Sequence, residues 1–135
     1  MATSITTKIA KEKLIKARCG EKSLPKVMKM AFGKGGTNEA NEPLEMDLEQ
    51  SSLNSELVRK NIDGYNITAY NKCEYYCTLN EQELVNEKIT EVALIDEEDD
   101  VIAIRNFKAK YKDNDMQLRF FIEDEFYKGE CYELF

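Results

Sequence analysis

Five consecutive acids, residues 96–100, form the densest group of side chains in the sequence that could do chemistry. They lie between two apolar runs, ITEVALI (89–95) and VIAIRNF (101–107). Clustered carboxylates can bind a hard cation such as calcium, or act as a pair in acid–base catalysis. The run lacks the alternating spacing and the glycine of an EF-hand loop. Because both flanking runs are rich in β-branched residues and predict strands, we interpret the acids as the solvated tip of a hairpin.

Thiols and imidazoles are the other groups from which an active or metal-binding site is often built. The chain has four cysteines and no histidine, and no two cysteines form a CxxC pair. A mixed cysteine–histidine zinc site and a histidine-based nucleophilic triad therefore cannot form within one chain. We predict no catalytic residue, no bound metal and no cofactor, and we expect reduced, buried thiols. The cysteines are Cys19, Cys73, Cys77 and Cys131.

A glycine-rich stretch, AFGKGGTNEANEP (31–43), is the remaining candidate for binding a small ligand. Gly33, Gly35 and Gly36 surround Lys34, a composition shared with phosphate-binding loops. A phosphate-binding loop requires the order GxxxxGK[ST] between a strand and a helix, whereas these glycines are followed by asparagine, glutamate and proline. We interpret the stretch as a flexible turn.

Length and charge restrict the class of protein and its partners. The chain has 135 residues, of which 42% are apolar and 33% charged, as in a single globular domain. The formal net charge of −7 repels phosphate groups, so we predict no binding to nucleic acid or to a membrane surface. No apolar run approaches the roughly 18 residues that span a bilayer, and the first residues lack a signal-peptide core. We expect the chain to be made in the cytosol.

The first part of the chain predicts a helix, a strand and a long loop. The helix ends at Gly20, and residues 25–33 alternate as a strand that ends at Gly33. The polar stretch 34–47 is long enough to predict a mobile loop. Four hydroxyl side chains are candidates for capping the start of the helix: Thr3, Ser4, Thr6 and Thr7. Its apolar residues share one half of a helical wheel: Ile5, Ile9, Ala10, Leu14 and Ala17.

Alternating patterns later in the chain predict further strands. The stretch YNITAYNKCEYYCTL (65–79) predicts one strand, and Phe120 and Ile122 belong to the last one. We expect Phe120 and Ile122 to face the helix at Ile9 and Leu14. The predicted fold class is α+β: one domain over all 135 residues, with an N-terminal helix packed on an antiparallel β-sheet or sandwich of at least five strands. The apolar face of the strand at 65–79 consists of Ile67, Ala69, Cys73, Tyr75, Cys77 and Leu79.

Several of these segments, in this order, resemble the N-terminal domain of phage tail-collar fibre proteins. That family has a strand ending in an A-[FL]-G-[DK]-G turn, which Gly33 and Gly35 match. It also has an I-x-E-[VI]-[AG]-L strand, which Glu91 and Leu94 match. The resemblance covers nearly the whole chain, and the order of the segments is more specific than any one of them. The segments are ITTKIAKEKLIKARCGEKSL, KVMKMAFGKGG, SSLNSELVRKNI, ITEVALID and MQLRFFIEDEF.

The resemblance implies a structural function. Such domains form the attachment end of a fibre, dock on the baseplate of a contractile tail and often associate as trimers. It implies that this chain is a small baseplate or adaptor subunit of a phage, or of a tail-derived bacteriocin (tailocin), made in the cytoplasm of a bacterial host. Its partners would be other baseplate or tail-fibre subunits and further copies of itself, and we expect no enzymatic activity. The alternative is a small carboxylate-dependent hydrolase or cation-binding protein.

Two segments carry residues that a core does not need, and we predict that both contact neighbouring subunits. The C-terminal tail, 127–135, combines aromatic and apolar residues, and aromatic residues are enriched at interface hot spots. The loop 34–47 is long and polar. Packing of the tail on its own domain is the alternative. The predicted contact residues are Tyr127, Tyr132, Leu134 and Phe135 in the tail, and Lys34, Asn38 and Asn41 in the loop.

Overall fold

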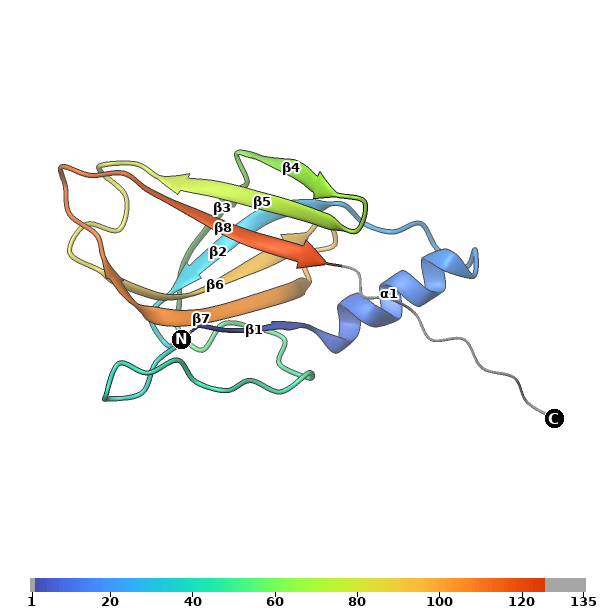
Figure 1. The fold of residues 1–135 in the computed structure, drawn as a ribbon, viewed down its shortest axis with the longest axis horizontal. Coiled ribbons are helices and arrows are strands. Elements are labelled where there is room, and N and C mark those ends of the chain that lie inside the picture. Colours follow the sequence, from blue (N-terminus) through green and yellow to red (C-terminus); the bar gives the residue numbers. More distant parts are fainter. Residues whose placement is uncertain (1, 126–135) are drawn as a thin grey trace.

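The computed structural model describes residues 2–125, which form a sandwich of two antiparallel β-sheets with one short helix (Figure 1). The larger sheet has the strand order β1-β7-β6-β2-β3, and the smaller sheet has the order β4-β5-β8. The predicted antiparallel sandwich is confirmed, but the fold is mostly β. The elements are β1 (Thr3–Thr6), α1 (Lys8–Arg18), β2 (Val27–Gly33), β3 (Glu56–Asn61), β4 (Gly64–Ala69), β5 (Lys72–Leu79), β6 (Lys88–Asp96), β7 (Val101–Tyr111) and β8 (Leu118–Glu125).

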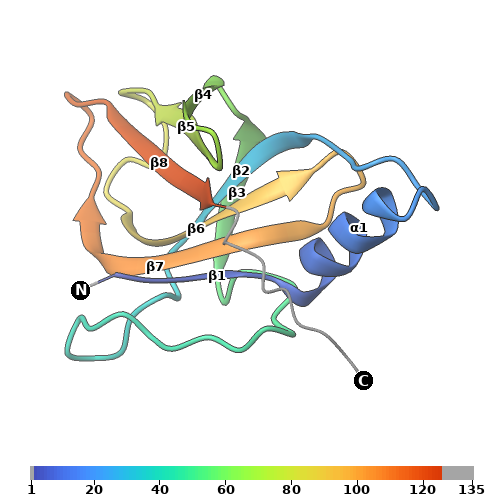
Figure 2. The same cartoon turned by 45° about the vertical axis from the view of Figure 1, so that its right-hand side comes forward.

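The main hydrophobic core lies between the two sheets (Figure 2). The ring of Phe120, on β8, packs edge to face against Phe32 of β2, with 5.3 Å between the ring centroids. It also packs against Phe107 of β7 at 5.8 Å. The prediction that Phe120 and Ile122 face the helix is therefore wrong, because both belong to the core between the sheets. Helix α1 lies at one end of the larger sheet, and none of its residues is buried.

The chain begins with a strand that the sequence did not predict. Thr3–Thr6 forms β1, which pairs with β7 from Asn106 to Ala103. The helix therefore begins only after Thr7, whose hydroxyl oxygen accepts a hydrogen bond from the N–H of Ala10 (3.3 Å) and caps the helix. Three of the four residues of β1 are β-branched, which favours an extended backbone over a helix.

The stretch predicted as one strand over 65–79 is a hairpin of two strands, β4 and β5. The turn consists of Tyr70 and Asn71, and Ala69 pairs with Lys72 across it. Cys77 and Leu79 face the core as predicted, but Ile67 is 75% exposed. The bulge between Ile67 and Ala69 brings Ile67 opposite Cys73, so odd-numbered residues stay on one face across the turn and the pattern did not reveal it.

The outer face of the larger sheet carries a second, smaller core, which the long segment between β2 and β3 covers. Leu53 in that segment is 5% exposed, and it packs with Ala93 and Ile95 of β6 and Ile104 of β7. Strand β6 is consequently buried on both faces, since every residue after Lys88 is buried. Burial on both faces explains why ITEVALI reads as a continuous apolar run rather than an alternating one.

Candidate functional site

The acid run forms the turn between β6 and β7, as predicted, but its first acid is not solvated. Asp96 is 3% exposed, and its two carboxylate oxygens bind different groups. Oδ1 accepts hydrogen bonds from the backbone N–H groups of Glu98 (2.9 Å) and Asp100 (3.1 Å), which fix the turn. Oδ2 accepts a hydrogen bond from Nζ of Lys13, on α1, at 2.6 Å. The interpretation of the run as a solvated tip is therefore wrong for Asp96.

Lys13 places its ammonium group among three carboxylates of the hairpin. Its Nζ lies 2.6 Å from Asp96, 2.7 Å from Asp100 and 3.1 Å from Glu98. Burial disfavours the charged form of Lys13, but the hydrogen bonds to Asp100, Asp96 and Glu98 outweigh it and raise the lysine pKa above its ordinary value. The lysine therefore stays charged and joins α1 to the hairpin. We refer to Lys13 with these three acids as the acid clamp.

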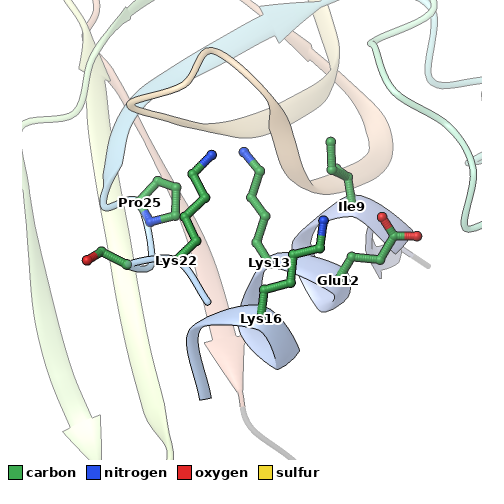
Figure 3. Close-up of a pocket in the computed structure, with 7 residues that line it drawn as sticks. Ile9, Glu12, Lys13, Lys16, Lys22 and Pro25 are labelled. Carbon is green, nitrogen blue, oxygen red and sulfur yellow. The ribbon is translucent and has the colours of Figure 1, made fainter. Parts of the chain in front are cut away.

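A second lysine, Lys22, binds the acid clamp from the segment between α1 and β2. Its ammonium group donates a hydrogen bond to Glu98, and this bond, followed by that of Lys13, lowers the pKa of the Glu98 carboxyl. Figure 3 shows the side chains of Lys13 and Lys22 pointing the same way, at a hollow between the helix and this segment. Lys16 and Pro25 also line the hollow. The hollow thus lies between α1 and the segment that follows it, and two of its lining residues, Lys13 and Lys22, form ion pairs with Glu98.

The two remaining acids of the run also have partners. The Glu97 side chain accepts a hydrogen bond from the N–H of Lys26 (3.0 Å), and Asp99 accepts one from Arg59 of β3 (2.8 Å). Within residues 2–125, no group of three or more cysteine, aspartate or glutamate side chains is arranged to hold a metal ion. The acids therefore bind the protein's own cations and N–H groups, and so connect α1, β2 and β3 to the hairpin.

A second carboxylate, Glu91 of β6, is fully buried and lies at the glycine-rich turn. Its Oε2 accepts hydrogen bonds from the backbone N–H groups of Gly35 (2.9 Å) and Ser55 (2.8 Å). Its Oε1 accepts a third from the N–H of Asn54 (2.9 Å). Three backbone N–H groups thus replace water around this carboxylate, which is a strong arrangement for a buried charge. Glu91 holds both ends of the long segment between β2 and β3 against β6.

The glycines of the turn leave the space that Glu91 occupies. A Cβ atom added at Gly33 would lie 2.4 Å from Oε2 of Glu91, and one added at Gly35 would lie 2.7 Å from the Cβ atom of Asn54. The N–H of Gly36 donates to the hydroxyl oxygen of Thr90 at 2.8 Å. Because the N–H groups of Gly35 and Gly36 bind side chains of β6, neither is directed at a phosphate. The interpretation of the stretch as a turn is consistent with this geometry.

Leu94, the remaining residue of the family pattern, and the predicted contact residues of the loop 34–47 lie in different environments. Leu94 is fully buried in the core between the sheets. Lys34 is exposed, and its Nζ lies 3.9 Å from Glu87. The side-chain oxygen of Asn38 accepts hydrogen bonds within the loop, whereas that of Asn41 accepts one from the N–H of Ala109 on β7 (3.0 Å). The mobility of the loop stays a prediction.

The tail, one of the two predicted contact segments, lies outside the described residues, so its contacts stay a prediction. Its predicted contact residues are Tyr127, Tyr132, Leu134 and Phe135. Sequence reasoning missed the partners that complete both charged sites, Lys13 and the N–H groups of Asn54 and Ser55. No local signal marks them, since Lys13 lies 83 positions from Asp96 and backbone N–H groups have no side-chain signature.

Glu91, Gly33 and Gly35 come from two separate segments of the family pattern, and the structure places them in contact. The model of the family described as phage tail-collar fibre protein, N-terminal, matches residues 1–120. The chain belongs to this family. No curated protein and no solved structure matches it. As a phage tail-collar fibre domain it is a structural protein of a phage tail, and its contact between glutamate and glycines is part of the scaffold.

The matched region ends within β8, so it includes both charged sites. It leaves out the tail that the sequence analysis predicts to contact neighbouring subunits. No helix among residues 2–125 is long and apolar enough to cross a membrane.

Proposed function

We propose that this tail-collar fibre domain is a subunit of a contractile tail, of a phage or a tailocin, and that it joins the baseplate to fibres or neighbouring subunits. The observation that carries the proposal is the family match over residues 1–120. The subunit has no enzymatic role. It is made in the bacterial cytoplasm and assembles there with other tail proteins and with copies of itself, as a homo-oligomer such as a trimer.

The chemistry of the two charged sites supports a scaffold. The acid clamp is filled by Lys13, and the carboxylate of Glu91 is surrounded by N–H groups. In both sites the acids are bound to the protein's own groups, so neither offers a carboxylate pair for hydrolysis. These contacts connect segments that lie far apart in the sequence, as expected of a scaffold.

We place the contacts with neighbouring subunits on the tail, 127–135, and on the loop 34–47. In the loop, Lys34, Asn38 and Asn41 are exposed. The loop lies at the edge of the sandwich, beside β1 (Figure 1). Polar exposed residues on a segment tethered to a sheet are suited to the rim of an interface.

Deletion of residues 128–135 tests this function. The full chain and the truncated chain are produced in bacteria together with the remaining tail proteins, and the particles are purified by sedimentation. We expect the full chain to sediment with the particles, and the truncated chain to fold normally by circular dichroism but to stay in the soluble fraction. Incorporation of the truncated chain would contradict the role of the tail, and exclusion of the full chain would contradict the function itself.

A further inference from the structure

A groove runs between β7 and β8, where the chain passes from the larger sheet to the smaller one. Three phenylalanine residues line it, Phe107, Phe120 and Phe121. Phe107 and Phe120 belong to the core, whereas Phe121 is 41% exposed. Arg105 crosses the groove and donates a hydrogen bond to the backbone carbonyl of Phe121 (3.4 Å). The groove is thus the open side of the sandwich, with aromatic residues at its wall.

Two strand edges border the groove. Among the described residues, β5 is the only strand that pairs with β8, and β1 pairs with β7 only up to Asn106. The N–H of Ala109 on β7 is bound by the side chain of Asn41. Open edges of this kind accept an additional strand, as in recognition of extended peptides by β-augmentation.

The groove is basic, although the chain carries a net charge of −7. Its cations form no ion pair within residues 2–125, whereas six other lysines and arginines do. Two of them lie over aromatic rings instead, Arg105 over Phe107 at 5.8 Å and Arg119 over Tyr76 at 5.2 Å. The groove therefore combines phenylalanine residues with positive charge that has no acidic partner among the described residues. The four cations are Arg105, Lys108, Lys110 and Arg119.

The segment of this chain that follows β8 has the complementary composition. Residues 126–135 read FYKGECYELF, with two glutamates, Glu130 and Glu133, among aromatic and apolar residues. Carboxylates can bind the unpaired cations through charge-assisted hydrogen bonds, and the aromatic residues suit a wall of phenylalanine residues. The segment contains no proline, so it can pair along its length with a strand edge.

The segment starts at the end of β8, whereas the groove lies at the start of β8, at Leu118 to Phe121. The tail of a second copy has no such separation to span, and the experiments below distinguish binding between copies from binding within one chain.

We infer that the groove between β7 and β8 binds residues 130–135 of a second copy of this chain. The inference rests on the proposed function in one respect, the assignment of the tail as an interface, and it adds the surface that receives the tail. Each copy offers one tail and one groove. The contact is therefore between different surfaces, which generates a closed ring when the rotation between copies closes.

The native thiol of Cys131 allows a direct test by disulfide trapping. Lys110→Cys is introduced into the full chain with Cys19→Ser, and equal amounts of isotopically light and heavy protein are mixed and oxidised. We expect covalent dimers and higher species, with a disulfide between Cys131 of one copy and the new cysteine of the other, identified by mass spectrometry. Lys11→Cys on exposed α1 is the matched control and should give at least tenfold less product. Absence of this disulfide, or its formation only within single chains, would overturn the inference.

Charge reversal provides the second test. The double substitution Lys108→Glu and Lys110→Glu keeps the strand edge charged, so the edge stays protected against aggregation. Self-association measured by sedimentation equilibrium should nevertheless weaken at least tenfold. Adding Glu130→Lys and Glu133→Lys should restore it. A mixture of the two singly reversed proteins should also regain association, because each groove then meets a tail of opposite charge on the other kind of copy. Unchanged association after groove reversal would contradict the inference. If these tests fail while the chain lacking 128–135 is still excluded from particles, the groove is not the surface that binds the tail, and the proposed function stands.

Discussion

Glu91 is a fully buried carboxylate that must be stabilised by protein groups in place of water. Its charge is withdrawn from water, and three backbone N–H groups from the segment between β2 and β3 bind it. A carboxylate is the one side-chain group that accepts from all three without offering a donor in return. The adjacent Gly33 is equally restricted, because any Cβ atom would meet the carboxylate at 2.4 Å.

Glu91→Gln should lower the free energy of unfolding by about 3 kcal/mol. The substitution keeps the size of the side chain, but it removes the charge and turns an NH₂ group toward backbone donors, and hydrogen bonds to charged groups contribute roughly 1.5–3 kcal/mol. Urea denaturation measures the change. Glu39→Gln, in an exposed position of the loop, should change stability by less than about 0.5 kcal/mol. Equal effects of the two substitutions would contradict the assigned role of Glu91.

Glu98 should titrate below its usual pKa of 4.5, because hydrogen bonds from Lys22 and then Lys13 favour its charged form. The folded-state pKa is lowered, so the ion pairs stabilise the fold above pH 4.5 and this contribution is lost as the pH falls through the lowered pKa. The carboxyl carbon of Glu98, followed by NMR, should show the lower midpoint, and Lys22→Gln should move it upward. A midpoint at or above 4.5 would contradict the ion pairs.

At the scale of elements, α1 is held by charge rather than by burial. None of its residues is buried, and its side chain Lys13 reaches the acid clamp at the end of β6. Thr7 contributes a second anchor, because its hydroxyl donates to the carbonyl of Val101 at 2.8 Å while capping the helix. The helix therefore depends on the turn between β6 and β7 for its position.

Lys13→Met should lower the free energy of unfolding by about 3 kcal/mol and loosen α1. Removing the cation leaves Asp96 buried without a countercharge, which is the costly way to break a buried ion pair. Hydrogen exchange of the α1 amides should become faster by at least tenfold. Lys16→Met, one turn away and exposed, is the matched control and should leave both quantities almost unchanged. Similar exchange rates in the two variants would show that the clamp does not hold the helix.

The core between the sheets gives a prediction for two neighbouring phenylalanines on β8. Phe120→Ala should cost about 3–5 kcal/mol, since its ring is buried against Phe32 and Phe107. Phe121→Ala should cost much less, because that ring is exposed and contacts Tyr76 on the outer face. Thermal denaturation of both variants checks the difference. A smaller loss for Phe120→Ala than for Phe121→Ala would reverse the assigned faces of β8.

The elements also show which parts of the fold the sequence could predict. The hairpin of β6 and β7 was predicted because its strands are β-branched runs around a polar turn. The start of α1 was not, because Thr3, Ser4, Thr6 and Thr7 are equally good caps and only pairing with β7 selects the last one. The importance of Glu91 came from the family pattern, whereas the burial of Asp96 depends on a lysine far away in the chain. Contacts between distant segments have no local signal.

At the scale of the molecule, charge is unevenly distributed. Four of the five hairpin acids bind lysines or an arginine, and Glu97 binds a backbone N–H. The groove between β7 and β8, in contrast, carries positive charge that has no acidic partner within residues 2–125. A scaffold domain with one basic aromatic groove and an acidic aromatic tail can assemble with copies of itself. Raising the salt concentration should weaken such assembly, because exposed charges are screened within about 8 Å at physiological ionic strength.

The most direct measurement of the proposed function is a cryo-electron microscopy map of tail particles that contain the chain. We predict that density matching the two-sheet sandwich, with α1 at one end of the larger sheet, lies at the baseplate in a ring of several copies. A gold label on a tagged chain should mark the same end of the tail. Complete particles that lack this density, with all of the chain remaining in the unassembled fraction, would contradict the claim that it is a structural subunit of the tail.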